Sequence, residues 1–311
     1  MDSRTPSLPS TPFEDVIVTT SNKEAGGHGG HWEIFFDDVG VLLKALPRII
    51  QEGKLALAYA DIKSAKPYPF PEREPKGALL VWPIPRFGLI AAIELDARSE
   101  ANELISAYPW VSEGAQHTIR LERVRLWPNR LEAQIDALVG ADEELSITFF
   151  DPLFAANRAF YNKDEIYPFV LVGFPYVLEI VDPAPIVIND MEKVRRLRTM
   201  MYKDDPAQRD TREPLVFETK GMAALLPRGD LAGDDYEFQG PVKSVTEFHT
   251  EMLGQQAWRV RITVRRHADK DFDIELCLTR KVLSDSRVPK IGEDVRGILW
   301  LQGYLWMPGL S

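Results

Sequence analysis

Near its C-terminus the sequence contains a strand-like segment in which arginine alternates with aliphatic residues. In WRVRITVRR, residues 258–266, Arg259, Arg261 and Arg265 fall on one face of an extended chain, and the valines and isoleucine fall on the other. A guanidinium group can hold a phosphate or a carboxylate through paired hydrogen bonds. The segment RLERVR provides a second, less regular set: Arg120, Arg123 and Arg125. All six are candidate anion-binding residues; the alternative is that they pair with some of the 47 acidic residues of the chain.

The last strand-like segment, ILWLQGYLW at 298–306, is apolar on both faces. Trp300, Tyr304 and Trp306 share one face, and leucines occupy the other. Exposed aromatic rings on a sheet can stack on nucleic-acid bases, with about 1–3 kcal/mol per base. Aromatic rings more often fill a core or a contact between domains. We therefore expect a strand buried on both sides, with base stacking as the alternative.

Asp61 and Lys63, in AYADIKSAK, have the Asp-x-Lys spacing of restriction-type nucleases. In such enzymes the carboxylate holds a divalent metal ion and the lysine orients the attacking water. Asp37 or Asp38 would supply the second ligand, although a helical segment separates them from Asp61. A nuclease site would therefore rest on a motif that lacks its usual structural context.

The glycine-rich segment GGHGGHWE offers another set of ligands, His28, His31 and Glu33. Two imidazoles and a carboxylate are a known zinc combination. Because the neighbouring glycines raise the entropy cost of ordering such a site, we interpret the segment as a linker. The sequence contains no phosphate-binding loop, dinucleotide fingerprint, nucleophile elbow or paired-cysteine site. It therefore indicates no resident metal and no cofactor.

Charge and composition narrow the classes of protein further. Residues 1–182 carry 17 basic and 27 acidic side chains, whereas residues 183–311 carry 20 of each. Generic binding of duplex DNA needs a strong positive field, which the chain as a whole lacks. Cys277 is the only cysteine, and the sequence has neither an apolar leader nor 18 consecutive apolar residues. We therefore expect a cytoplasmic protein without membrane helices.

Hydrophobic alternation predicts strands over most of the chain after residue 85. The expected strands are 86–95, 117–127, 130–139, 144–150, 166–181, 214–226, 235–248, 257–266, 271–279 and 294–306. The segment 32–65 is expected to be mainly helical. Within it, Asp37 or Asp38 can cap the helix that begins at VGVLLKALPRIIQ (39–51), and residues 55–62 could form a strand. Further helices are expected at 99–108 and, in a charged segment, at 189–212, whereas four prolines within 66–77 predict a loop.

Two stretches of expected strands resemble each other in order. A shift of 128 residues aligns three identical pairs: Glu165 with Glu293, Leu171 with Leu299 and Tyr176 with Tyr304. Each long final strand contains a glycine, Gly173 or Gly303, as sharp curvature requires. We therefore predict a mainly β fold with an α+β N-terminal part, built as a tandem of small antiparallel barrels, OB-like or SH3-like. The expected segments are a flexible arm (1–31), an α+β domain with the first barrel (32–182), a charged helical linker (183–213) and a second barrel domain (214–311).

The missing catalytic motifs and the acidic first half favour a non-enzymatic binding protein. We expect an adaptor, inhibitor or accessory subunit whose barrel surfaces contact a protein partner, with the acidic surface facing a protein that handles nucleic acid. One alternative is a single-stranded nucleic-acid binder that uses the arginine face and the aromatic residues of the C-terminal barrel. The other is a metal-dependent nuclease at Asp61 and Lys63. Small barrels host all three functions, so the fold alone does not decide between them.

Overall fold

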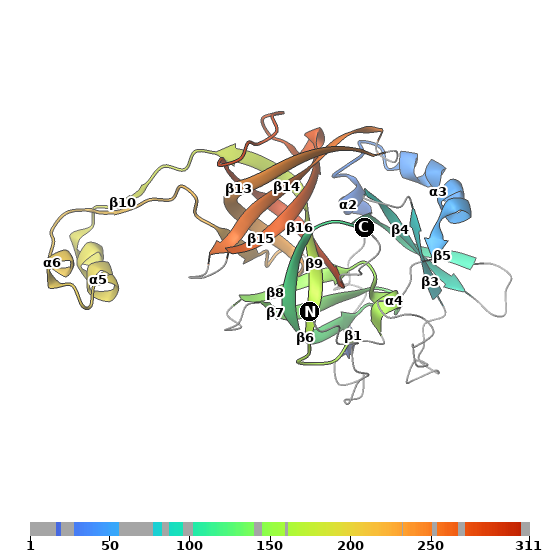
Figure 1. The fold of residues 1–311 in the computed structure, drawn as a ribbon, viewed down its shortest axis with the longest axis horizontal. Coiled ribbons are helices and arrows are strands. Elements are labelled where there is room, and N and C mark those ends of the chain that lie inside the picture. Colours follow the sequence, from blue (N-terminus) through green and yellow to red (C-terminus); the bar gives the residue numbers. More distant parts are fainter. Residues whose placement is uncertain are drawn as a thin grey trace, which may run out of the picture.

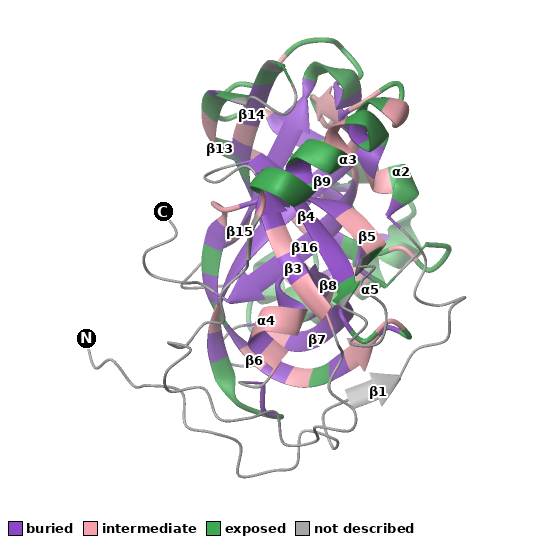
Figure 2. Cartoon of the chain, turned by 90° about the vertical axis from the view of Figure 1, so that its right-hand side faces the viewer, coloured by how far each residue is buried: buried purple, intermediate pink, exposed green. Residues whose placement is uncertain are grey.

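The computed structural model describes residues 17–19, 28–55, 77–82, 87–95, 102–139, 145–158, 161–231, 233–250, 254–266 and 271–305. Over these residues the protein is mainly β, as predicted, and has few helices (Figure 1). The strands form sheets of ten, four and two members. Buried residues follow the strands of the two larger sheets, and the outer surface of the helices is exposed (Figure 2).

The ten-stranded sheet has the order β1-β6-β7-β8-β16-β9-β15-β14-β13-β12. Its N-terminal members are β1 (Ile17–Thr19), β6 (Ala115–Leu126), β7 (Ala133–Val139), β8 (Leu145–Asp151) and β9 (Ile166–Val181). Its C-terminal members are β12 (Ala224–Pro227), β13 (Asp235–Thr250), β14 (Gln255–Arg266), β15 (Asp271–Thr279) and β16 (Asp294–Leu305).

Additional pairings close this order into two circuits of strands. β6 also pairs with β9, and β16 also pairs with β13. One circuit therefore runs β6-β7-β8-β16-β9 and returns to β6. The other runs β16-β13-β14-β15-β9 and returns to β16. β9 and β16 belong to both circuits and lie at the centre of the molecule (Figure 1).

The four-stranded sheet is antiparallel and lies beside the first circuit. Its strands follow chain order: β2 (Lys54–Leu55), β3 (Gly77–Trp82), β4 (Phe87–Leu95) and β5 (Asn102–Val111). We call the two larger sheets and the helices near them the body of the protein. Its described helices are α2 (Gly29–Trp32), α3 (Gly40–Glu52), α4 (Phe154–Asn157) and the 3₁₀ turn η4 (Arg280–Val282). The N-cap position of α3 is Val39, which makes no side-chain cap, but the preceding Asp38 accepts a hydrogen bond from Gly40 N at 2.8 Å, so a carboxylate does bind a free amide of this helix, as predicted. No helix among the described residues has the length and hydropathy needed to cross a bilayer.

Residues 183–217 leave the sheets and return to them as a projecting arm (Figure 1). The outgoing strand β10 (Ile186–Ile188) pairs antiparallel with the returning strand β11 (Leu215–Phe217). Between them lie α5 (Met191–Met201) and α6 (Pro206–Arg209), which confirms a helix within the charged segment 189–212. Asp190 caps α5 by accepting hydrogen bonds from the amides of Glu192 and Lys193 at 3.0 and 3.2 Å.

Each strand expected after residue 85 has a counterpart in the structure, except that 214–226 is divided into β11 and β12. The helix expected at 99–108 is wrong, because its described residues, 102–108, form most of β5, a strand that pairs with β4 over nine positions. Tyr108 and Trp110 are buried by that pairing, and their burial outweighs a weak local preference for helix. Of the strand expected at 55–62, only Leu55 is described; the remainder and the proline-rich loop 66–77 lie largely outside the described residues.

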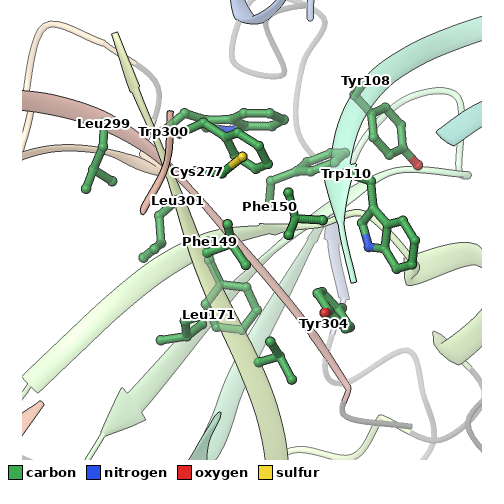
Figure 3. Close-up of a cluster of buried hydrophobic side chains, with 14 of the residues drawn as sticks. Tyr108, Trp110, Phe149, Phe150, Leu171, Cys277, Leu299, Trp300, Leu301 and Tyr304 are labelled. Carbon is green, nitrogen blue, oxygen red and sulfur yellow. The ribbon is translucent and has the colours of Figure 1, made fainter. Parts of the chain in front are cut away.

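The final strand is buried on both sides, as predicted. Every residue from Leu299 to Leu305 is buried. Figure 3 shows Trp300 and Tyr304 on the side of β5, near Phe150 and Trp110, with Leu299 and Leu301 directed away from them. β16 can be apolar on both faces because it separates two packed layers, so this apolar strand needs no ligand to cover it.

The two strands aligned by the 128-residue shift do not occupy separate units. β9 and β16 pair with each other, from Asp294 opposite Val181 to Leu305 opposite Phe169. β16 also pairs with β8 of the first circuit and β13 of the second. The domain boundaries at 182 and 213 and the internal duplication stay predictions. Two barrels built from these strands would both contain β16, because it pairs with strands of both circuits.

A single methyl group between the two central strands should destabilise the fold. A Cβ atom at Gly297 would lie 2.0 Å from the carbonyl oxygen of Val177 on β9, a distance that requires the backbone to shift. We expect Gly297→Ala to lower the free energy of unfolding by about 1–3 kcal/mol, as overpacking does in other cores. Urea titration followed by tryptophan fluorescence measures this change. Gly229→Ala is the matched control, since its Cβ would meet nothing within 4 Å; an equal effect of both variants would contradict the close approach of β9 and β16.

Candidate functional site

A chain of buried hydrogen bonds connects the glycine-flanked histidines to a glutamate far along the sequence. His28 Nε2 lies 2.7 Å from Glu132 Oε1, and His28 Nδ1 lies 3.0 Å from His31 Nδ1. Glu132 also accepts a short hydrogen bond from Asn129 Nδ2. The single turn of α2 brings the two histidines together, because His28 and His31 are three positions apart and such residues are neighbours on the surface of a helix. We call Glu132, His28 and His31 the histidine–glutamate chain.

Aromatic rings enclose this chain. His28 stacks on Trp127 at a centroid distance of 5.1 Å, and Tyr108, Phe150 and Trp300 surround its other sides. His31 stacks on Trp300 at 3.6 Å with an interplanar angle of 10°. These contacts order the last residues of the segment interpreted above as a flexible arm. Burial against rings from β5, β8 and β16 supplies the stabilisation that the glycine-rich segment itself cannot provide.

Burial also sets the protonation of His31. Desolvation, and then the nearby His28, lower the pKa of His31 well below its ordinary value. His31 is therefore neutral near pH 7, and one of the two facing Nδ1 atoms carries the shared hydrogen. Glu33, the third zinc ligand considered from the sequence, is exposed, while the histidines bond to each other and to Glu132. Among the described residues no group of three or more His, Cys, Asp or Glu side chains could hold a metal ion.

A cavity of about 480 Å³ lies beside the histidine–glutamate chain. Most of its wall is apolar and comes from α3, β5 and Trp32, whereas the polar part comes from His28 and the turn after β6. Its lining residues are His28, Gly29, Trp32, Leu42, Leu43, Leu46, Leu104, Ile105, Ser106, Ala107, Trp127, Pro128, Asn129 and Glu132. An apolar cavity with a few convergent polar groups is the usual form of a binding site.

A second buried polar cluster lies on the other side of Trp300. The indole Nε1 donates to Asp234 Oδ2 at 2.8 Å, and Gln134 Nε2 donates to Asp234 Oδ1 at 2.7 Å. Desolvation, and then the adjacent Asp235, raise the pKa of Asp234 to about 7. Tyr176 donates to Asp235 at 2.7 Å. The bond to Asp234 fixes the indole edge of Trp300, and the same carboxylate, just before β13, is bonded to Gln134 of β7.

Another buried carboxyl group with a raised pKa lies at the end of a strand of the first circuit. Asp151, at the end of β8, accepts hydrogen bonds from Tyr161 and, at 2.9 Å, from the amide of Leu153. Desolvation raises the pKa of Asp151 to about 7, although both hydrogen bonds act in the opposite direction. The Tyr161 hydroxyl is buried with it, and its own pKa is raised well above the ordinary value.

Arg259, Arg261, Arg123 and Arg125 each form ion pairs within the chain. Arg259 pairs with Glu113, and Arg261 pairs with Glu275, directly opposite on β15, at 2.9 Å. The predicted aliphatic face of β14 is confirmed, since the valines and isoleucine of 260–264 are fully buried. A bulge after Thr263 interrupts the alternation before Arg265, which is partly exposed.

The second arginine set is organised around one carboxylate. Arg123 and Arg125 both contact Asp136 Oδ2, at 2.7 and 2.9 Å, while Arg120, near the middle of β6, is partly exposed. Thr148 Oγ1 donates to the other oxygen of Asp136 at 2.8 Å. Three of the strand arginines, Arg123, Arg125 and Arg261, therefore pair with a carboxylate on the neighbouring strand.

The remaining predicted binding residues are core residues or lie outside the described part. Trp300 and Tyr304 are buried, so their rings present no face to a base. Trp306, Asp61 and Lys63 lie outside the described residues. Asp37 forms an ion pair with Lys281 at 3.0 Å and Asp38 caps α3.

The arm carries a different kind of surface, because large apolar side chains are exposed along its length. About half of Val187 on β10 and of Val216 on β11 is exposed, and the two lie directly opposite each other. The other exposed apolar residues of the arm are Ile186, Met191, Met200 and Met201. We call these six side chains the apolar surface of the arm.

Sequence patterns did not indicate the main features of these sites. Histidine between glycines suggested a linker, and Glu132 and Asp234 carry no local signal, because their partners lie 104 and 66 residues away. The only usable hint was the aromatic richness of the strands that enclose them. For the arm, the apolar run PIVIND before a charged helix was visible in the sequence, but its exposure was not.

Comparison with known proteins does not assign the chain to a family. The chain matches no protein-family model, no curated protein and no solved structure. Its function must therefore be inferred from the geometry of its own sites.

The buried carboxyl of Asp151 predicts a pH-dependent stability. Its pKa is higher in the folded than in the unfolded chain, so the folded state holds the extra proton between about pH 4 and 7. The free energy of unfolding should fall as pH rises through that window, by at most about 1.4 kcal/mol per pH unit from this group, and then level off. We expect Asp151→Asn to remove this part of the slope, because the amide can still bond Leu153 and Tyr161.

Urea titrations at half-unit steps from pH 4.5 to 8.5 measure the slope. Asp230→Asn serves as the control, because Asp230 is exposed and its pKa is lowered by Arg228. Its removal should leave the slope above pH 5 unchanged. A wild-type slope in Asp151→Asn would show that Asp151 is ionised in the folded chain at neutral pH.

Proposed function

We propose that the protein is a non-enzymatic binding protein, an adaptor or accessory subunit, and that it contacts a protein partner through the apolar surface of the arm. The observation that carries this proposal is the exposure of six large apolar side chains on a segment that projects away from the body (Figure 1). Large contiguous apolar patches on a protein surface mark interaction sites. The arm extends the contact surfaces expected from the sequence beyond the strands themselves.

The two-stranded ribbon of β10 and β11 would be more stable with a partner covering it. It has three residue pairs, Ile186 with Phe217, Val187 with Val216 and Ile188 with Leu215. All are apolar, and no other described strand pairs with either edge. A two-stranded ribbon of this size is marginally stable in water by itself. A partner that packs on the ribbon or adds a strand to it would supply the missing burial.

The tip of the arm is ordered by a buried arginine rather than by an extensive core. Val194 and Arg198 of α5 are buried, and Arg198 Nη1 donates to the carbonyl of Gln208 at 2.9 Å. The methionines at 191, 200 and 201 remain about half exposed or more. Methionine is flexible and polarisable, and it is common on surfaces that bind protein segments. The arm carries seven basic and six acidic residues, so apolar contact rather than net charge would drive its binding.

The body supports the same class of function. We interpret the two circuits of strands as a pair of small, OB-like or SH3-like barrels that share β9 and β16, because each set of pairings returns to its first strand. Such a body would act as a rigid scaffold for the arm. We expect it in the cytoplasm, since Cys277 is the only cysteine of the chain.

The nucleic-acid alternative gains no support of its own. Its stacking residues Trp300 and Tyr304 are buried, and Arg259 and Arg261 are paired with glutamates. Releasing these arginines for phosphate contacts would leave Glu275, which is itself buried, without its partner.

Arg198 should be required for order in the arm and not for the stability of the body. We expect Arg198→Ala to raise amide hydrogen exchange over residues 191–213 at least about tenfold, because local opening needs little free energy where few apolar contacts exist. Exchange in β9 and β16 should stay unchanged, as read by mass spectrometry of peptic fragments. Equal protection of the tip in both proteins would contradict the ordering role of Arg198.

Removing the apolar surface of the ribbon should abolish partner binding. The double variant Val187→Lys, Val216→Glu replaces the exposed pair by opposite charges that can still pair across the ribbon. We expect its tagged full-length form, expressed in the native host, to recover at least about tenfold less of any stoichiometric partner than the wild type does, measured by quantitative mass spectrometry.

Ile291→Lys is the matched control, because Ile291 is an exposed apolar residue of the body, with 69% of its surface accessible. This variant should recover as much partner as the wild type. Recovery that is equal in the arm variant, or the absence of any stoichiometric partner, would overturn the proposed function.

A further inference from the structure

We propose that the cavity beside the histidine–glutamate chain binds a small, uncharged and mainly apolar molecule. The cavity forms a groove beside β5, with α3 as a further wall, and its volume is about 480 Å³. A volume of this size lies within the range of sites that hold small organic ligands. This site is separate from the arm, and neither proposal depends on the other.

The apolar part of the wall comes from four elements of the body. Helix α3 contributes three leucines, and β5 contributes a leucine and an isoleucine. Two buried tryptophans complete it, Trp32 of α2 and Trp127, which directly follows β6. Leu43 of α3 has 63% of its surface exposed. A leucine in this position is removed from water only when a molecule fills the cavity beside it, and that burial would stabilise the complex.

The polar groups of the wall are already bonded to one another. The ring nitrogens of His28 lie 2.7 Å from Glu132 Oε1 and 3.0 Å from His31 Nδ1. The other oxygen of Glu132 accepts a hydrogen bond from Asn129, whose own side-chain oxygen accepts from the amides of Leu131 and Glu132. Glu132 is only 1% exposed. These bonds hold the wall together and leave no free charge for a ligand.

The absence of a free charge selects an uncharged ligand. Apart from His28 and Glu132, no described lining residue is ionisable. A charged molecule would lose its hydration in the cavity without gaining a partner of opposite charge, which is costly. Ser106 lines the cavity and is partly exposed, so its hydroxyl can bond one polar atom of an otherwise apolar molecule.

Gly29 provides a way to fill the cavity without removing any atom of the fold. It lines the cavity and is exposed, so the cavity reaches the surface at this residue. A Cβ atom at Gly29 would meet no described neighbour within 4 Å. A larger side chain can therefore occupy this space. Gly30, the next residue of α2, has equally free surroundings but does not line the cavity.

Titration of the full-length protein with 2-acetylnaphthalene near pH 7, followed by isothermal titration calorimetry, tests the proposal. We expect saturable binding to a single site. Two charged analogues of similar shape, 2-naphthoate and protonated 2-naphthylmethylamine, should bind at least about tenfold more weakly, because neither finds a free counter-charge. A lack of saturable binding by 2-acetylnaphthalene, or equal binding of either charged analogue, would overturn the proposal.

Substitutions in two different walls locate the site. Gly29→Leu should weaken binding of 2-acetylnaphthalene at least about tenfold by occupying the cavity, and Leu43→Asp should do the same by placing a charge beside the apolar ligand. Gly30→Leu and Val41→Asp are the matched controls, because both residues are exposed and neither lines the cavity. Both controls should bind the ligand as the wild type does.

The urea midpoint of each variant separates loss of binding from loss of folding. If Leu43→Asp does not fold, Gly29→Leu decides the test, since it adds atoms only to open space. Wild-type affinity in a folded Gly29→Leu would place the ligand elsewhere and overturn the proposal. The arm variant Val187→Lys, Val216→Glu should bind 2-acetylnaphthalene as the wild type does, so that failure of this proposal and failure of the proposed function are distinguishable.

Discussion

The antiparallel pairing of β9 with β16 is the interaction on which the rest of the structure depends. It runs through nearly the whole length of β16, and each of the two circuits of strands closes through it. Both strands must therefore be apolar on both faces over most of their common length. Gly297, where a side chain would meet the backbone of β9, shows how closely the two strands approach. The C-terminal strand consequently completes packing that begins more than a hundred residues earlier.

Trp300 connects this pairing to the buried polar groups. One side of its ring packs on His31, and its indole hydrogen is accepted by Asp234. Through His28 and Glu132 the same set of contacts reaches the turn after β6. Polar groups buried in this way stabilise a fold only when they are fully hydrogen-bonded, and they then restrict the core to one arrangement. The histidine–glutamate chain thus orders a glycine-rich segment and forms the polar part of the groove beside β5.

The arm differs in physical character from the body. It presents apolar side chains on a small scaffold of one ribbon and two helices. Binding at the arm would depend on buried apolar area. Three of the predicted binding arginines, Arg123, Arg125 and Arg261, are instead paired with carboxylates on neighbouring strands, where opposite charges stabilise a sheet.

The sequence by itself determined the local structure and the class of fold. Alternation such as WRVRITVRR predicted β14 with its buried aliphatic face, and the doubly apolar ILWLQGYLW predicted a strand buried on both sides. The tertiary structure alone decided which strands are neighbours, that β5 is a strand rather than a helix, and that His28 meets Glu132. The physical reason is that period and propensity act between residues a few positions apart. Register between distant strands depends on the simultaneous packing of all of them, and no short segment encodes that.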